Sequence, residues 1–433
     1  MFANLKGLFS PSNKDLRKRI LFTLMCLAIF ALGTNIIIPG AKSITNNIGF
    51  LELLSLVSGG NLKTFSIFSL GVMPYITASI ITQLLQMDII PYFKELKESG
   101  ATGRQKINKI NRYLGMLLAF VQAYVFSLTL LKGDAMTTIK STVYLTAGTA
   151  FLIWLGDEMT KKGIGNGMSL IIMAGIVNNL PSTFITAFQN LIINGSYNMT
   201  SGIILFVLFI IVYLAIILGV VYMQIAERRI PIQYSNRTSG AYAGEKSYIP
   251  IKLNTASVVP VIFASAIIGI PSVIANILNK EAFTNFVNNY IVYTSYTGFI
   301  LYMLLIFVFG YFYTLLELNP DEMAENLDTN RSYIPGIVPG EATSKYLKYV
   351  ITRISTFGTL GLMVIAALPI IFTKISNLPS NVTLGGTGLI IVVGVALETY
   401  KQLESSIISR SYTEKEEEVD NEKYYIYCAS SCW

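Results

Sequence analysis

The chain has 433 residues but no histidine, only three cysteines and only 13% charged residues. Without histidine, an HExxH zinc site and a serine or cysteine activated by histidine are excluded. The cysteines do not support a disulfide framework, because Cys26 falls inside an apolar run, far from Cys428 and Cys432. No G-x-x-x-x-G-K-[ST] sequence occurs, which excludes ATP binding through a P-loop. We therefore predict a protein that is not an enzyme and that uses no cofactor and no metal.

Charged residues are missing from long stretches of the chain, and hydrophobic residues make up 53% of it. An apolar helix of about 20 residues spans the hydrocarbon core of a bilayer. The pattern therefore predicts an all-α polytopic membrane protein with ten transmembrane helices. The predicted spans are 20–38, 66–87, 113–131, 143–157, 168–193, 202–225, 256–278, 297–318, 350–373 and 384–400.

Lysine and arginine are unequally divided between the two sides of these spans. The basic segment Lys14–Arg19 leads into an apolar run without a signal-peptide cleavage pattern, so we interpret this run as the first transmembrane helix. With the N-terminus in the cytoplasm, all but six of the 32 lysine and arginine residues lie inside, as the positive-inside rule requires. We predict a multi-pass protein of the cytoplasmic (cell) membrane with both termini cytoplasmic.

The net charge of +7 is concentrated in loops beside the spans. This distribution fits membrane topology and contact with anionic lipid. Two loops, 226–255 and 319–349, are longer than topology requires. They leave open a second interpretation, namely a surface on which partners dock.

The centres of the spans lack Asp, Glu, Lys and Arg altogether. The acidic residues Asp88, Asp157, Glu317 and Glu398 all fall near predicted span ends. Ion-coupled carriers usually place a titratable group at the midplane, so a secondary transporter with inverted repeats is disfavoured but stays open as an alternative. An intramembrane enzyme would need paired carboxylates, or a nucleophile and a base, inside the spans, and the sequence has none there.

One stretch combines a segment too short to span with a helix that can. Residues 50–57 are apolar but end in Ser58-Gly59-Gly60, and a long apolar run follows. At membrane depth a short segment must be shielded by protein or line a cavity, because its unpaired backbone groups cannot face lipid. Helix-breaking residues in several spans favour helices that bend around a passage. These residues are Gly71 and Pro74 in the second span, Pro260 and Pro271 in the seventh, and the glycine-rich turn 163–167 before the fifth.

Short motifs then follow one another in a fixed order between about residue 15 and residue 410. They include Ser58-Gly59-Gly60, Gly71-Val72-Met73-Pro74-Tyr75-Ile76, Gly103-Arg104 with Asn111-Arg112-Tyr113, Gly163-Ile164-Gly165-Asn166-Gly167, Arg228-Arg229-Ile230-Pro231, Pro260-Val261-Ile262-Phe263-Ala264-Ser265, Asn319-Pro320, Pro339-Gly340-Glu341 and Gly385-Gly386-Thr387. In these motifs and in their order the chain resembles the SecY family, which supplies the pore subunit of the bacterial protein-conducting channel.

The resemblance implies two inverted five-helix halves around a central pore. It divides the chain into a cytoplasmic N-terminus 1–19, an N-terminal half 20–193 with a plug at 50–65, a segment 194–255 with helix six and the docking loop 226–255, a segment 256–400 with helices seven to ten and the docking loop 319–349, and a cytoplasmic tail 401–433.

The resemblance also assigns a pore constriction and a plug that blocks it. A collar of apolar side chains resists ion leakage by dewetting and offers a moving peptide no strong binding site. The implied constriction residues are Val72, Ile76, Met168, Ile172, Val259, Ile262 and Ile391. The implied plug residues are Phe50, Leu53, Leu54, Val57, Gly59 and Gly60.

A lateral gate between helices two and three and helices seven and eight is implied as well. Its assigned residues are Gln83, whose amide would favour the closed state by hydrogen bonding, Pro74 and Pro260. Partner docking is assigned to Arg228, Arg229, Arg237, Lys345 and Lys348. Arginine suits such a surface, because it pairs with RNA phosphates or with the carboxylates of an acidic motor.

The function implied by the resemblance is that of a passive channel. It would translocate secretory polypeptides across the membrane and release transmembrane segments laterally into lipid. Its partners would be the SecE and SecG subunits, the SecA motor, the ribosome, signal peptides, nascent chains and membrane lipid, with no small-molecule substrate. An accessory Sec channel with restricted clients is an alternative within the same class.

Three features depart from the family pattern. Val338 stands where the family usually has arginine, which puts the usual docking of the motor in doubt. Ser257 stands where a glycine is common before the seventh helix. The tail beyond Arg410 has no counterpart in the resemblance.

Overall fold

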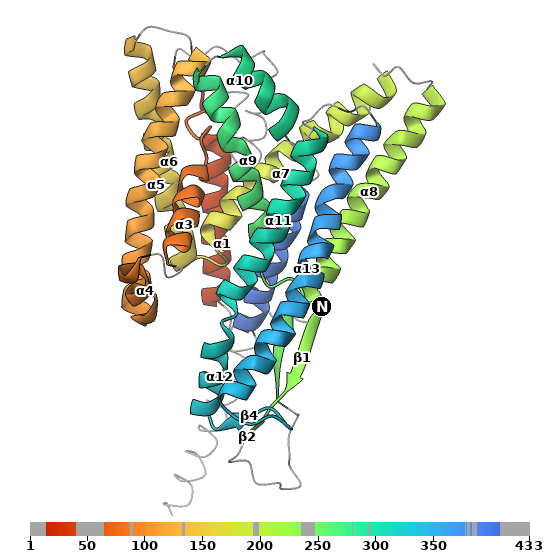
Figure 1. Cartoon of the computed structure of the whole chain (residues 1–433). Helices are drawn as coiled ribbons and strands as arrows, with labels where there is room; N and C mark the ends of the chain where they lie inside the picture. Colours follow the sequence, from red (N-terminus) through yellow and green to blue (C-terminus); the bar gives the residue numbers. More distant parts are fainter. Residues whose placement is uncertain are drawn as a thin grey trace, which may run out of the picture.

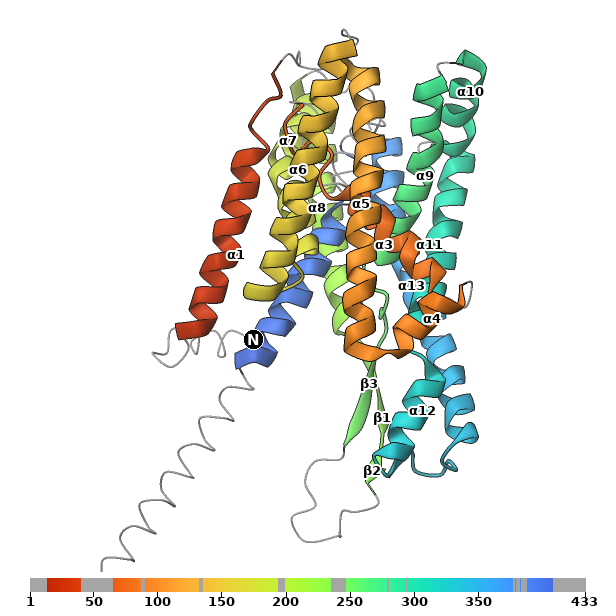
Figure 2. The same ribbon diagram turned by 90° about the vertical axis from the view of Figure 1, so that its left-hand side faces the viewer.

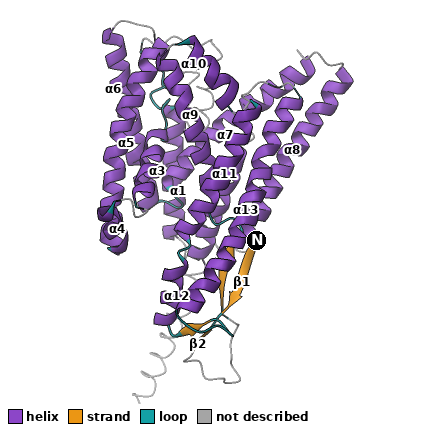
Figure 3. Ribbon diagram, viewed as in Figure 1, coloured by secondary structure: helices purple, strands orange, loops and turns teal. Residues whose placement is uncertain are grey.

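A computed structural model describes residues 14–39, 65–86, 90–131, 135–193, 199–234, 247–278, 280–292, 295–376, 378, 382 and 388–407. The chain is mostly helical (Figure 3). Long helices form a bundle, and short strands together with one short helix project from one end of it (Figure 1). We call this end of the bundle the strand end.

The first half of the chain contributes helices that lie side by side. They are α1 (Lys14–Gly33), α3 (Met73–Leu85), α4 (Pro91–Glu98), α5 (Gly100–Leu131), α6 (Ala135–Lys162) and α7 (Gly167–Phe188), which continues as the π-helical turn η4 (Gln189–Ile193). Helix α5 contacts α3, α4 and α6. Helix α1 stands at the edge of the bundle against α6 and α7 (Figure 2).

The second half adds the strands and the remaining helices. The helices are α8 (Met199–Ile225), α9 (Val259–Leu278), α10 (Glu281–Phe286), η5 (Val287–Ile291), α11 (Tyr296–Glu317), α12 (Pro320–Thr329), α13 (Glu341–Ile375) and a last helix over residues 388–407. The strands are β1 (Glu227–Pro231), β2 (Gln233–Tyr234), β3 (Tyr248–Lys252) and β4 (Ser332–Tyr333).

Within the described residues, four helical stretches are long and apolar enough to cross a bilayer. They are Gly167–Ile193, Met199–Ile225, Tyr296–Thr329 and Glu341–Ile375. Met73–Leu85 and Val259–Ser272 are shorter apolar helices. Each predicted span overlaps a helix of the structure. The multi-pass helical architecture is therefore confirmed, whereas the count of ten crossings stays a prediction.

The second predicted span begins later than expected. Residues 65–72 form turns, and helix α3 starts only at Met73. Two backbone hydrogen bonds join the turns to the segment that follows α1, from Ile38 N to Phe65 O at 3.1 Å and from Ile67 N to Ile36 O at 3.0 Å. The expectation that Pro74 interrupts this helix is wrong: it lies in the first turn, where its missing N–H costs no helical hydrogen bond.

The prediction of an all-α protein is also wrong in one region. Strand β1 pairs with β3 in an antiparallel sheet, and β2 pairs with β4. The second pair joins the loop 226–255 to the loop 319–349, and the Tyr333 hydroxyl donates to Gln233 Oε1 at 3.0 Å. The two predicted docking loops are therefore one structural unit.

This unit has a hydrophobic core of its own. Ile230 of β1, Ile251 of β3, Leu327 of α12 and Leu347 of α13 are buried together. Burying a side chain of this size contributes about 1.5–3 kcal/mol. We call β1, β2, β3, β4, α12 and the first turns of α13 the docking module.

Leu347→Ala should loosen the docking module. Leu347 has 0% exposure, and truncating a buried leucine to alanine costs about 2–5 kcal/mol. Amide hydrogens of β1 and β3 should exchange faster in the detergent-solubilised variant, as measured by mass spectrometry. Glu341→Ala is the control, because its ion pair with Lys345 lies in solvent. Equal exchange in both variants would show that this core does not hold the strands.

Candidate functional site

Most of the predicted constriction residues belong to the central apolar core. One continuous hydrophobic cluster runs through the bundle, and Ile76 packs against it as a partly buried neighbour. The buried members among the predicted constriction residues are Val72, Met168, Ile172, Ile262 and Ile391. They come from α3 and the turn before it, from α7, from α9 and from the last helix. Five of the seven residues thus belong to this large apolar cluster and Ile76 packs against it; we call these six residues the collar.

Val259, the seventh residue, lies elsewhere. It is the first residue of α9 and lines a cavity of about 430 Å³. The cavity is formed by the end of α8, the connection from β3 to α9, α11 and the last helix. Its charged lining residues are Lys252, Glu317, Glu398 and Lys401. We call this cavity the vestibule: a polar space beside the apolar core.

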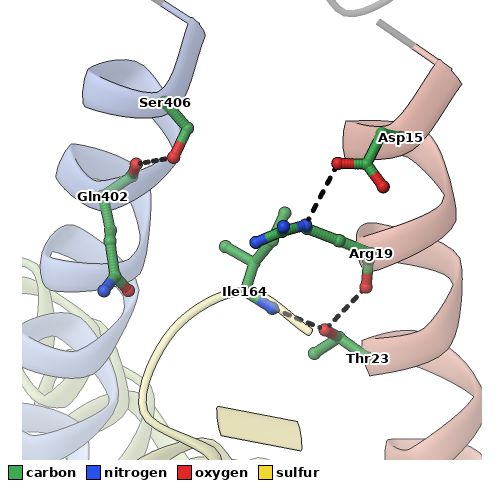
Figure 4. Close-up of polar contacts among 6 residues, drawn as sticks. All are labelled: Asp15, Arg19, Thr23, Ile164, Gln402 and Ser406. Carbon is green, nitrogen blue, oxygen red and sulfur yellow. Dashed lines mark hydrogen bonds and ion pairs between the residues drawn. The ribbon is translucent and has the colours of Figure 1, made fainter. Parts of the chain in front are cut away.

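The glycine-rich turn 163–167 holds the start of α7. The Thr23 hydroxyl accepts a hydrogen bond from Ile164 N at 3.1 Å and donates to Arg19 O at 2.9 Å (Figure 4). Gly167 N donates to the Thr160 hydroxyl at 2.9 Å. Asn166 caps α7 by accepting from Met168 N at 3.1 Å. Side chains from α1 and α6 therefore satisfy this turn and fix the helix that carries Met168.

Glycine is required at two positions of this turn. Gly165 has φ +82°, and a Cβ there would lie 3.1 Å from Thr399 Oγ1 of the last helix. A Cβ on Gly167 would lie 2.0 Å from Gly156 O, which is inside van der Waals contact. The turn therefore packs α6 and α7 closely together and lies against the last helix, which is seen opposite α1 in Figure 4.

The start of α9 is held by polar side chains. Ser257 has φ +53°, a left-handed conformation that costs a residue other than glycine about 1–3 kcal/mol. Its hydroxyl accepts from Gln224 Nε2 at 3.3 Å, and its carbonyl accepts from Asn254 Nδ2 at 3.0 Å. Lys401 Nζ donates to Gln224 O at 3.0 Å. Partial burial lowers the pKa of Lys401, and the neighbouring charge of Lys252 lowers it further.

The predicted gate residues lie on α3 and α9. Gln83 Nε2 approaches Ser79 Oγ of its own helix at 3.4 Å, and Gln83 Oε1 is buried without a hydrogen-bond partner among the described residues. Pro74 and Pro260 are buried in the first turns of α3 and α9. Helix α5 contacts α9, which brings the two halves of the chain together at this side. Gln83 thus bonds within α3 in this structure.

The predicted docking residues are exposed on the docking module. Arg228 and Arg229 lie on β1; the Arg229 guanidinium pairs with Glu227 at 2.8 Å and stacks over the Tyr248 ring at 4.7 Å. The hydrogen bond that Arg229 donates to the Glu227 carboxylate raises the pKa of Arg229. Lys345 and Lys348 are exposed on α13, which already begins at Glu341.

Several predicted residues fall outside the described part of the chain. They are Arg237 of the docking loop and the plug residues Phe50, Leu53, Leu54, Val57, Gly59 and Gly60. Val338 is described, and its side chain is 72% exposed in the turn before α13.

The sequence analysis missed three residues whose hydrogen bonds join separate elements near the starts of α7 and α9: Thr23, Gln224 and Lys401. Gln224 had a usable signal, because it is a single amide near the end of an apolar run. Thr23 and Lys401 had none, since their partners are 141 and 177 residues away in the chain.

Comparison with known sequences identifies relatives along nearly the whole chain. A family model described as SecY matches residues 66–400. The protein translocase subunit SecY of Staphylococcus epidermidis is 42% identical and covers 93% of this chain and 96% of its own length. The protein of the same name from Halalkalibacterium halodurans is 40% identical and covers 95% of this chain and 99% of its own length.

Comparison with solved structures identifies the same fold. A structure described as that of a protein conducting channel has a TM-score of 0.67 at 21% identity, over 90% of this chain and 92% of that chain. Sec61 in a canine ribosome–channel complex has a TM-score of 0.64 at 21% identity, with the same coverage. These likenesses show a shared fold.

Gly167→Ala should force α6 and α7 apart, because the new methyl group would overlap Gly156 O. Overpacking of this kind costs about 1–3 kcal/mol, so the thermal unfolding midpoint in detergent should fall. Ser169→Ala, in the first turn of the same helix, should leave the midpoint unchanged. If Gly167→Ala unfolds at the parent temperature, the close approach of α6 and α7 does not stabilise the fold.

Proposed function

The chain belongs to the SecY family, and from this premise we propose that it forms a passive protein-conducting channel. The channel translocates secretory polypeptides across the membrane and releases transmembrane segments laterally into lipid. The chain is a translocation subunit and not an enzyme. Because its sequence has no P-loop, the energy for transport comes from partners that act on it.

The observation that carries this proposal is the collar beside the vestibule. Apolar side chains from α3, α7, α9 and the last helix share one buried cluster. The charged vestibule lies next to this cluster, with Val259 on its lining. A narrow apolar passage excludes hydrated ions, because water leaves it, yet it binds no particular side chain of a passing polypeptide strongly. This combination supports transport of unfolded chains of varied sequence.

Lateral release requires a seam in the bundle. We place this seam between α3 with α5 on one side and α9 with α11 on the other. Helices α3 and α9 are apolar, and each has a buried proline in its first turn. Gln83 Oε1 is buried and has no hydrogen-bond partner in the described part of the chain. This supports a role of the amide at the seam, since a buried acceptor gains from any donor that reaches it. The plug at 50–65 remains part of the proposal.

The docking module supports the proposed partners. Its exposed arginines, Arg228 and Arg229, suit the phosphates of ribosomal RNA or an acidic surface of a motor such as SecA. The relatives are named as subunits of a translocase, which supports assembly with SecE and SecG. In this proposal the docking module and both termini are cytoplasmic, and the chain lies in the cell membrane.

Cysteines placed at Ile76 and Ile262 should form crosslinks to an arrested secretory polypeptide. Both side chains belong to the collar region, so they should contact a chain that passes through it. The three native cysteines are first replaced by serine, and crosslinking is measured in membranes with a bifunctional thiol reagent.

Cysteines at Leu218 and Ile204 provide the matched controls, because these side chains are 68% and 63% exposed on α8. They should give crosslinks to lipid-directed probes and none to the arrested polypeptide. Crosslinks from α8 alone would contradict a passage through the collar.

Ile391→Asn should make the channel leak ions. Ile391 is 3% exposed within the collar, and an amide there would retain water. Placing an unpaired amide in such a site costs about 1–3 kcal/mol, so a wetted state should gain about tenfold in population. Conductance in planar bilayers should rise accordingly, while the volume-conserving variant Ile391→Leu should behave like the parent. An unchanged conductance in Ile391→Asn would show that Ile391 does not seal the passage.

A further inference from the structure

We propose that Gln224, Ser257 and Lys401 form a polar latch that positions the first turn of α9, and therefore one wall of the collar, against the last helix. The three residues come from the end of α8, from the connection before α9 and from the last helix. None of them contributes an apolar side chain to the collar. They act through the residues that follow Ser257 and are positioning residues. The inference rests on the proposed channel function.

The latch joins three elements through two consecutive contacts. Lys401 Nζ donates to Gln224 O at 3.0 Å, and Gln224 Nε2 donates to Ser257 Oγ at 3.3 Å. Gln224 is only 8% exposed. Gln224 thus contacts the last helix through its backbone carbonyl and the connection to α9 through its side chain.

The contact with Lys401 has a clear physical reason. The last carbonyl groups of a helix have no intrahelical partner, and they carry the negative end of the helix dipole. Gln224 O belongs to the last turn of α8. A lysine ammonium that donates to this carbonyl satisfies an otherwise unpaired acceptor and interacts favourably with the dipole. The contact therefore ties the last helix to α8.

The contact with Ser257 fixes an unfavourable backbone conformation. Ser257 has a positive φ of +53°, which serine adopts only when its surroundings enforce it. Gln224 holds its hydroxyl, and Asn254 holds its carbonyl at 3.0 Å. Held from both sides, Ser257 sets the direction in which the chain enters α9.

The collar lies directly beyond this point. Val258 follows Ser257 and belongs to the buried cluster that contains Ile262 and Ile391. A Cβ on Gly394 would lie 2.5 Å from Val258 Cγ1 and 2.9 Å from Gln224 Nε2. The backbone of the last helix therefore lies close to both the latch and Val258, which precedes α9 in the same buried cluster as the collar. A shift of the latch moves α9 relative to the helix that carries Ile391.

The test uses the assembled translocase in proteoliposomes and measures ion leakage together with transport of a normal secretory precursor. Ser257→Ala removes one hydroxyl, Gln224→Leu removes the amide and Lys401→Met removes the ammonium. Each should raise leakage by roughly tenfold, the effect of losing one hydrogen bond of a charged or buried group. Lys401→Arg keeps a cationic donor and should restore low leakage.

Two control variants change residues that make no contact in the latch. Ser406 lies on the last helix, and its hydroxyl donates to Gln402 O of the same helix at 2.9 Å. Lys106 is an exposed lysine of α5. Ser406→Ala and Lys106→Met should therefore leak no more than the parent.

A further variant separates the hydroxyl from the backbone conformation. Ser257→Gly also lacks the hydroxyl but adopts a positive φ without strain. The latch predicts raised leakage for both Ser257→Ala and Ser257→Gly. Leakage from Ser257→Gly alone would show that backbone stiffness, and not the hydrogen bond from Gln224, holds α9 in position, and would overturn the latch.

The outcomes also separate this inference from the channel function. If Ile391→Asn leaks but all three latch variants stay sealed at normal abundance, the latch is wrong and the channel stands. If Ile391→Asn stays sealed and the parent transports no precursor, the channel function itself fails. Should Lys401→Met not assemble, Ser257→Ala decides the result, because it removes a single oxygen atom.

Discussion

Every backbone N–H and C=O inside a bilayer needs a hydrogen-bond partner from the protein, and this requirement governs the helices of the bundle. The long helices meet it internally. The three breaks described near the collar meet it with specific contacts. Residues 65–72 bond to Ile36 and Ile38, just after α1. The turn 163–167 bonds to Thr23 and Thr160, and the connection before α9 is bonded through Gln224 and Asn254. Specific hydrogen bonds thus hold these interruptions between the helices.

The sequence predicts the helices well, because apolar runs of membrane length leave few alternatives. Six of the seven predicted constriction residues lie in or against the central apolar cluster, but the sequence pointed to them through family motifs and not through periodicity. The prediction from sequence fails where residues that precede or begin a helix are interpreted as a kink inside it. Gly71 and Pro74 look like interruptions of a helix, but Gly71 lies in the turns before α3, at φ +56°, and Pro74 in its first turn. Composition alone cannot distinguish a kink inside a helix from a turn that precedes it, since glycine and proline are common in both.

The strands and the polar contacts could not be predicted for a different reason. Strand β2 has two residues, and its partner β4 lies about one hundred residues further along the chain. So short a segment has no detectable alternation. Likewise, Thr23 and Lys401 are ordinary polar residues within helices until the fold brings Ile164 and Gln224 to them. Such long-range pairing has no local signature in a single sequence.

The docking module and the collar are too close in the chain to move independently. Strand β3 ends at Lys252 and α9 begins at Val259, and the short connection between them is bonded at Asn254 and Ser257. At the other edge, β1 follows directly after α8, and Leu253 N donates to Ala226 O at 2.8 Å. A partner that displaces the sheet of β1 and β3 therefore acts on both α8 and α9. Because packed cores shift between discrete arrangements and do not deform continuously, such a displacement reaches the collar as a change of packing.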